Sequence, residues 1–229
     1  MKRLIEIRGI DMSKIRFICA FALAASFICP AVYSDEPLDP ARLKVSVSDS
    51  DAPKTVKTTD GRTLKLVWQD EFNGTGLPDA SKWGYEVGYV RNNERQYYTD
   101  ARLENIFQKD GCLTIKTIEE KYPIEGKPGS QGRKEADYTS AAIETFGKAS
   151  WQYGRVEVRA QLPTGKGIWP AIWMMGDNIG QVGWPGCGEI DIMEYVGHTP
   201  HTSHGTIHMR RKGGERWQNV SKGNKLELD

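Results

Sequence analysis

Short stretches in which apolar and polar residues alternate recur along the chain from Leu64 onward. Gly154-Arg-Val-Glu-Val-Arg-Ala160 is one example, and Gly111-Cys-Leu-Thr-Ile-Lys-Thr117 is another. Alternation with a period of two places successive side chains on opposite faces, which is typical of a β-strand with one buried face. Glycine, proline, asparagine and aspartate separate the stretches, as in turns between strands. Because no stretch has the spacing of a long amphipathic helix, the pattern predicts an all-β fold, an antiparallel β-sandwich.

The first part of the chain has a different pattern. Lys14 and Arg16 precede the apolar run 17–29, and Pro30 and small residues follow it. A basic flank, a short apolar run and a small-residue exit predict a secretory signal peptide over residues 1–34. The run is shorter than the roughly 20 residues that a membrane-spanning helix needs. We therefore expect a secreted or periplasmic protein with no membrane attachment after cleavage.

The domain organisation follows from this segment. Residues 35–62 are polar and contain several prolines, serines and aspartates, so we expect a linker there and a folded domain over residues 63–229. Met12 is an alternative start of the chain. Cleavage of the signal peptide leaves Cys112 and Cys187 as the remaining cysteines, and the sequence does not decide whether they pair.

The composition excludes one class of partner. The 31 Lys and Arg residues balance 30 Asp and Glu residues, which gives a formal net charge of +1. A nucleic-acid-binding domain normally has a clear basic excess, so we expect no nucleic-acid partner. The seven tryptophans indicate a packed core, an interface or a surface on which sugars stack.

Three carboxylates, Glu189, Asp191 and Glu194, lie in one segment of otherwise large apolar residues. On a regular strand Glu189 and Asp191 share a face, whereas Glu194 lies on the opposite face. One extra residue around Ile192 and Met193, accommodated as a β-bulge, returns Glu194 to the face of the other two acids. We predict this bulge, with Met193 as the surplus residue.

Three acids on one face suit the hydrolysis of glycosidic bonds. Two carboxyl groups about 5 to 5.5 Å apart support the retaining mechanism, in which one is the nucleophile and the other is first an acid and then a base. The residues alone also allow an acidic edge strand that faces solvent. Calcium binding is a further alternative, although the apolar residues between the acids lack the glycine and asparagine of a flexible ion loop.

The segment Trp184-Pro-Gly-Cys-Gly-Glu-Ile-Asp-Ile-Met-Glu194 resembles the active-site strand of glycoside hydrolase family 16, in its laminarinase-like (endo-β-1,3-glucanase) branch. The resemblance extends over residues 64–209 and implies a jelly-roll, concanavalin A-like sandwich. It also implies a secreted retaining enzyme that cleaves internal β-1,3 or mixed β-1,3/1,4 glucan linkages. The other matching motifs, in the family's order, are Leu66-Val-Trp-Gln-Asp-Glu-Phe72, Asn92-Asn-Glu-Arg-Gln-Tyr-Tyr98, Tyr138-Thr-Ser-Ala141, Tyr153-Gly-Arg-Val-Glu-Val-Arg159, Gly167-Ile-Trp-Pro-Ala-Ile-Trp-Met174 and Gly205-Thr-Ile-His208.

The resemblance also implies roles for individual residues. Glu189 is expected to be the nucleophile, Asp191 the assisting acid and Glu194 the general acid/base. The residues expected to bind substrate are Trp184, Trp169, Trp173, Asn93, Glu94, Arg155 and His208. Most of these binding roles have a structural alternative. The tryptophans can be core residues, Asn93 can serve the turn chemistry of the Asn-Asn pair, and Arg155 can be an ordinary charge on a strand.

No cofactor or metal is expected for catalysis, although the complete family fold can hold a structural calcium ion. All four histidines, His198, His201, His204 and His208, lie close together in sequence, which makes a zinc site an alternative. Their spacing through threonine, serine and proline without a cysteine pair argues against it, and we expect the first three in loops. The expected partner is a β-glucan polysaccharide, and the expected state is a monomer.

The chain departs from the family pattern at two places. Ala142 stands where laminarinase-like members often carry an arginine, and the absence of that arginine is expected to weaken binding at one subsite or to alter substrate choice. Residues 210–229 lack the content of the strands that normally follow, so the resemblance implies a fold without its C-terminal strands. Open sheet edges predict poor stability and little activity. The alternatives to an active hydrolase are therefore a non-catalytic β-glucan-binding protein on the same fold and an inactive truncated gene product.

Overall fold

The computed structural model describes residues 4–6, 17–25, 54–213 and 216–228, and it consists almost entirely of β-strands in this part of the chain. The described residues form a single helical turn, α1 (Ile179–Val182). They contain no helix of the length and apolar character that crossing a membrane requires. The predicted all-β class is confirmed.

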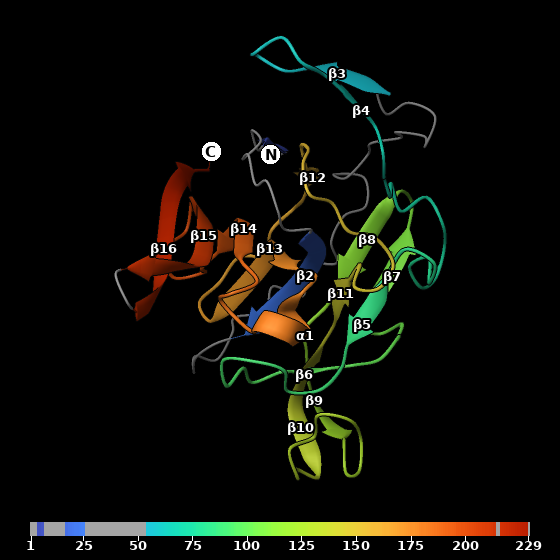
Figure 1. Cartoon of the computed structure of the whole chain (residues 1–229). Helices are drawn as coiled ribbons and strands as arrows, with labels where there is room; N and C mark the ends of the chain where they lie inside the picture. The colour runs from blue at the N-terminus through green and yellow to red at the C-terminus, as the bar shows by residue number, and fades with distance from the viewer. Residues whose placement is uncertain (1–3, 7–16, 26–53, 214–215, 229) are drawn as a thin grey trace.

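The largest sheet, which we call the main sheet, has seven strands in the order β16-β15-β14-β13-β2-β11-β5 (Figure 1). Every neighbouring pair in it is antiparallel. Its strands are β2 (Phe17–Ala25), β5 (Gly84–Glu86), β11 (Ala142–Glu144), β13 (Ile168–Gly176), β14 (Glu189–Tyr195), β15 (Thr202–Gly213) and β16 (Arg216–Glu227).

The remaining strands form small sheets. β10 (Glu135–Ser140) pairs antiparallel with β9 (Ile118–Pro123) and parallel with β6 (Tyr97–Tyr98). We call β9 and β10 the β9–β10 hairpin, and it extends from the lower end of the molecule in Figure 1. The two-stranded antiparallel pairs are β1 (Leu4–Glu6) with β12 (Glu157–Arg159), β3 (Thr55–Lys57) with β4 (Thr63–Lys65), and β7 (Ile106–Lys109) with β8 (Cys112–Ile115).

One face of the main sheet packs a hydrophobic core at two places. Near β13 and β14, apolar side chains from the segment 151–162 cover buried residues such as Ile172 and Met193. Near β11, Ile143 packs with Trp83 and with side chains from the β7–β8 hairpin. Burial on one face leaves the alternate side chains of each strand on the opposite face, and the acids of β14 lie there.

β2 lies between β13 and β11 and pairs with both along its backbone. It is part of the apolar run from which the sequence predicts a signal peptide, and that assignment stays a prediction. We expected open sheet edges from the missing C-terminal strands, but at this position β13 and β11 are both paired with β2. The edges of the main sheet are β16 and β5. Most of the predicted linker, residues 35–53, lies outside the described residues, and its last part contains β3.

Candidate active site

The three acids of β14 share one face because the strand contains a bulge. Against β13, Asp191 and Met193 pair with adjacent residues, so Ile192 between them has no partner. The register with β15 shifts at the same place, between Asp191 and Glu194. The predicted bulge is confirmed, but seen from β13 the surplus residue is Ile192 rather than Met193.

The bulge separates apolar from acidic side chains. Ile192 and Met193 are both buried in the core, although they are consecutive. Glu194 lies on the opposite side, where the Nε1–H of Trp169 donates a hydrogen bond to its Oε1 at 3.1 Å. We call this side of the main sheet, which carries Glu189, Asp191 and Glu194, the acid face.

Trp184 and Trp169 donate hydrogen bonds to the two outer acids, and their indole rings stay accessible to solvent. The indole N–H of Trp184 donates a hydrogen bond to Glu189. Trp184 is 50% exposed and Trp169 is 38% exposed. Neither ring is therefore core packing, and each combines an exposed apolar surface with a polar contact to a carboxylate.

His208 connects the central acid to β16. Its Nε2 lies 3.1 Å from Oδ2 of Asp191, and its Nδ1 lies 2.7 Å from the hydroxyl of Ser221. The backbone register places it directly opposite Glu189, and its ring centre lies 6.0 Å from that of Trp184. His208, one of the residues expected to bind substrate, thus lies beside the acids, and Ser221 is a contact that the sequence did not reveal.

Burial and crowding shift Asp191 and Glu194 toward their protonated forms. Burial first, then the charges of Glu194 and Glu189 and a hydrogen bond with Glu189, raise the pKa of Asp191 to about 8. Burial also raises the pKa of Glu194, although the hydrogen bond from Trp169 opposes the shift. Near neutral pH Asp191 is therefore neutral and can donate a hydrogen bond to Glu189, and Glu194 is displaced toward the form that donates a proton.

Trp173 forms part of the base of the acid face rather than its surface. It is only 8% exposed and packs with Met175 and Cys187, whose thiol is free, as is that of Cys112. The guanidinium of Arg91 lies over its ring at 5.0 Å from the centre. This burial corresponds to the core-packing alternative for Trp173, in contrast to the other two tryptophans.

Arg91 is a cation on the acid face that the sequence analysis did not single out. It forms an ion pair with Glu86 of β5, and Glu86 lies opposite Ala142 of β11. Ala142, where the family often has an arginine, is buried and packs with Tyr98. One guanidinium on this side of the sheet thus comes from the segment before the Asn-Asn-Glu motif, and the position of Arg91 directly before that motif was the available signal.

The Asn-Asn-Glu segment is a turn with one buried acid. Asn92 and Asn93 both have a φ of 53°, in the left-handed region that asparagine tolerates. Asn93 is exposed, whereas Glu94 is 8% exposed and accepts a hydrogen bond from Gln96 at 3.0 Å. Burial raises the pKa of Glu94. Arg155 forms an ion pair with Glu157 of β12, outside the main sheet.

The histidines divide into two groups. His198 and His201 lie in the turn between β14 and β15, as expected. The expectation of a loop is wrong for His204, which lies on β15 directly opposite Glu194. The described residues contain no group of histidine, cysteine and acidic side chains that could hold a metal ion, so nothing there supports zinc binding.

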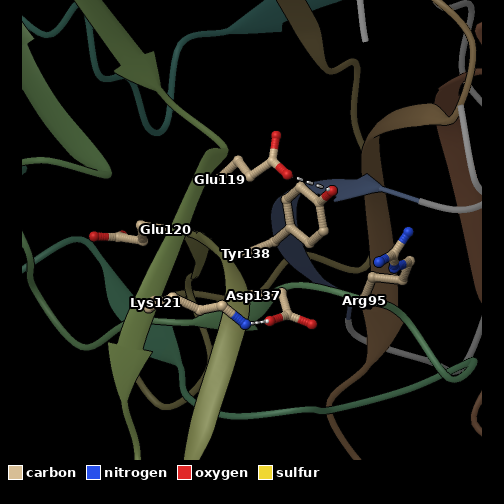
Figure 2. Close-up of a pocket in the computed structure, with 6 residues that line it drawn as sticks. All are labelled: Arg95, Glu119, Glu120, Lys121, Asp137 and Tyr138. Atoms are coloured by element: carbon tan, nitrogen blue, oxygen red, sulfur yellow. Dashed lines mark hydrogen bonds and ion pairs between the residues drawn. The ribbon is translucent and has the colours of Figure 1, made fainter. Parts of the chain in front are cut away.

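A second cluster of acids lies at the β9–β10 hairpin, around a cavity of about 290 Å³ (Figure 2). Lys121 forms ion pairs with Asp137 and Glu135, and the Tyr138 hydroxyl donates a hydrogen bond to Glu119 at 3.2 Å. A hydrogen bond from Lys121 lowers the pKa of Asp137. The cavity is lined by Arg95, Glu119, Glu120, Lys121, Asp137 and Tyr138.

Comparison with known proteins identifies a matching family and relatives with glucanase names. The family model described as glycosyl hydrolases family 16 matches residues 92–227. A beta-glucanase of Rhodothermus marinus is 51% identical over 150 residues, which cover 64% of this chain and 49% of that protein. Glucan endo-1,3-beta-glucosidase A1 of Niallia circulans is 42% identical over 170 residues, which cover 70% of this chain and 24% of that protein. The chain thus spans about half or less of these two relatives.

Solved structures agree with the fold. The laminarinase from Rhodothermus marinus matches with a TM-score of 0.60 and 45% identity, covering 71% of this chain and 61% of that chain. The laminarinase catalytic domain from Thermotoga maritima matches with a TM-score of 0.60 and 43% identity, covering 72% and 63% respectively. These likenesses confirm the predicted jelly-roll sandwich.

Proposed function

The chain belongs to glycosyl hydrolases family 16, and we propose that it is an endo-acting β-glucanase that cleaves β-1,3 or mixed β-1,3/1,4 linkages. The observation that carries this proposal is the bulge of β14, which brings Glu189, Asp191 and Glu194 to one face. The names of the beta-glucanase and endo-1,3-beta-glucosidase relatives support the substrate class.

The proposed reaction proceeds in two steps with retention of configuration. Glu189 attacks the anomeric carbon while Glu194 donates its proton to the glycosidic oxygen, which leaves with the departing chain. Glu194 then removes a proton from water, and the water oxygen displaces Glu189 from the anomeric carbon. The raised pKa of Glu194 supports its role as the acid of the first step.

Asp191 orients the nucleophile in this mechanism. In its neutral form it donates a hydrogen bond to Glu189, which complements the bond that Glu189 accepts from Trp184. The second oxygen of Asp191 then accepts the Nε2–H of His208, and Nδ1 of the same ring accepts the hydroxyl of Ser221. Two donors on the attacking carboxylate fix its position before the substrate arrives.

The exposed rings of Trp184 and Trp169 are the proposed sugar-stacking surfaces beside the nucleophile and the acid.

We also propose export through the signal segment, a monomeric state and catalysis without a cofactor. Calcium binding by the complete family fold stays a prediction.

The test is the release of reducing sugar from laminarin and lichenan, together with the anomeric form of the first product by proton NMR. We expect hydrolysis with a β-anomer product, and Glu189→Gln should abolish it. A purified, folded chain that releases no sugar from either glucan would overturn the proposal. Binding of laminarin without release, and unaffected by Glu189→Gln, would indicate the glucan-binding alternative.

A further inference from the structure

The acid face continues past the three acids onto the β15–β16 hairpin. His208 and Ser221 are paired residues of these strands, and their hydrogen bond shows that both side chains point to the acid face. Paired residues two positions further along share that face, because side chains alternate in both strands. The first such pair is Arg210 with Asn219, and the second is Lys212 with Trp217.

Trp217 is exposed in a way that core packing does not explain. It is 65% exposed, which makes it the most exposed of the seven tryptophans. It lies on β16, an edge strand of the main sheet (Figure 1). A large exposed indole on an edge strand carries a cost in unfavourable hydration, and such a side chain often marks a binding surface.

Arg210 lies between this indole and the acids. A Cβ atom placed on Gly186 would lie 3.6 Å from Nη1 of Arg210, so the guanidinium is beside the loop that carries Trp184. Trp184, Arg210 and Trp217 therefore follow one another outward from Glu189. Trp217 is four residues from Ser221, a distance of about 14 Å along the strand, which a short oligosaccharide spans.

We propose that Trp217, with Arg210 and Asn219, forms a distal sugar-binding subsite that holds a glucan chain beyond the residues at the acids. The indole offers a flat apolar surface to a sugar ring, and the guanidinium and the amide offer hydrogen bonds to its hydroxyl groups. The subsite rests on the proposed β-glucanase function, because its position is defined relative to the acid face.

The test compares Trp217→Ala with the parent chain on β-1,3-glucan oligosaccharides of increasing length. For the longest oligosaccharides and for laminarin we expect KM to rise about twofold to tenfold, because one aromatic contact is lost. For trisaccharides we expect no change in KM, and kcat should stay constant for all lengths. Trp217→Phe should recover part of the loss. Tyr153→Ala is the matched control, because Tyr153 is a similarly exposed aromatic residue outside the main sheet.

Equal values for Trp217→Ala and the parent on long substrates would overturn the subsite. An equal rise in KM for short and long substrates would also overturn it, because it would indicate a structural role. If the parent hydrolyses no glucan, the proposed function fails separately, and retardation of the chain in a laminarin-containing gel tests the subsite directly. Weaker retardation of Trp217→Ala than of Tyr153→Ala would then support the subsite, and equal or absent retardation would refute it.

Discussion

Two regions of this protein each gather several carboxylates, and the surroundings of these carboxylates differ in opposite ways. On the acid face, the partners of the acids are two indoles, an imidazole and one another. At the β9–β10 hairpin, Lys121 pairs with Asp137, and Arg102 pairs with Glu120. The pKa values of Asp191 and Glu194 are raised, whereas those of Asp137 and Glu120 are lowered.

The difference teaches that the partner, and not the acid itself, decides what a carboxylate can do. An acid beside a cation stays ionised and contributes at most to local order. An acid that is buried beside another acid holds a proton near neutral pH, which is the state that general acid catalysis needs. Acids at the hairpin cavity of Figure 2 therefore lie among cations, whereas the acid face carries acids whose pKa values suit general acid catalysis.

The largest test of this comparison makes the same substitution in both regions. Glu194→Gln should lower kcat/KM on laminarin by about 10²- to 10⁴-fold, because the proposed proton donor is lost. Glu119→Gln, at the hairpin, should leave kcat/KM unchanged. Far-UV circular dichroism should be the same for both variants and the parent. Similar losses of activity in the two variants would refute the distinction between the regions.

The sequence predicted on which face of β14 each acid lies, but it did not predict which neighbouring side chains are buried. The alternation of Glu189 and Asp191 with isoleucines, together with the family motif, was enough to predict the bulge and the position of Glu194. The burial of Trp173 was not predictable, because Arg91 covers its ring from a segment far away in the sequence. A period of two assigns a side chain to a face, but what packs on that face depends on the tertiary structure.

The same limit applies to the fold. The short alternating stretches predicted an all-β sandwich, which the structure confirms. The pairing of β2 was not predicted, because a short apolar run has the same pattern in a signal peptide as in a buried strand. His204 was misplaced for a related reason, since its serine and threonine neighbours also suit a loop.

The second test concerns stability as a function of pH. The pKa of Asp191 is raised to about 8 in the folded chain, and its ordinary value is 3.8. Between these values the folded chain holds a proton that the unfolded chain has lost. The free energy of unfolding therefore falls as pH rises, by up to about 1.4 kcal/mol per pH unit. Asp191→Asn stays neutral and should flatten this fall between pH 5 and pH 8.

Urea unfolding at pH 5 and pH 8 measures the effect, and Asp137→Asn is the control. The pKa of Asp137 is lowered, so its contribution is lost only as pH falls into the acidic range. Asp137→Asn should therefore keep the parent's slope between pH 5 and pH 8. An unchanged slope in Asp191→Asn would show that this acid does not hold a proton in the folded chain.

A smaller effect is expected from the contact that positions His208. Ser221→Ala removes one hydrogen bond from the imidazole and should lower kcat/KM by about twofold to tenfold, because one neutral hydrogen bond is lost. The loss should appear in kcat and should shift the pH profile of kcat, since the imidazole contacts Asp191. Ser221→Thr keeps the hydroxyl and should recover activity. A change in KM alone would contradict a positioning role.

The smallest effect is expected at the hairpin itself. The Lys121 side chain is 70% exposed, and hydrogen bonds with Asp137 first and Glu135 next raise its pKa. Exposed ion pairs are screened by water and salt, so Lys121→Ala should leave the urea midpoint and laminarin hydrolysis unchanged at moderate ionic strength. Measurement of both at low and high salt checks this. A clear loss of activity in Lys121→Ala would mean that the hairpin acids take part in substrate binding, and the contrast between the two regions would then fail.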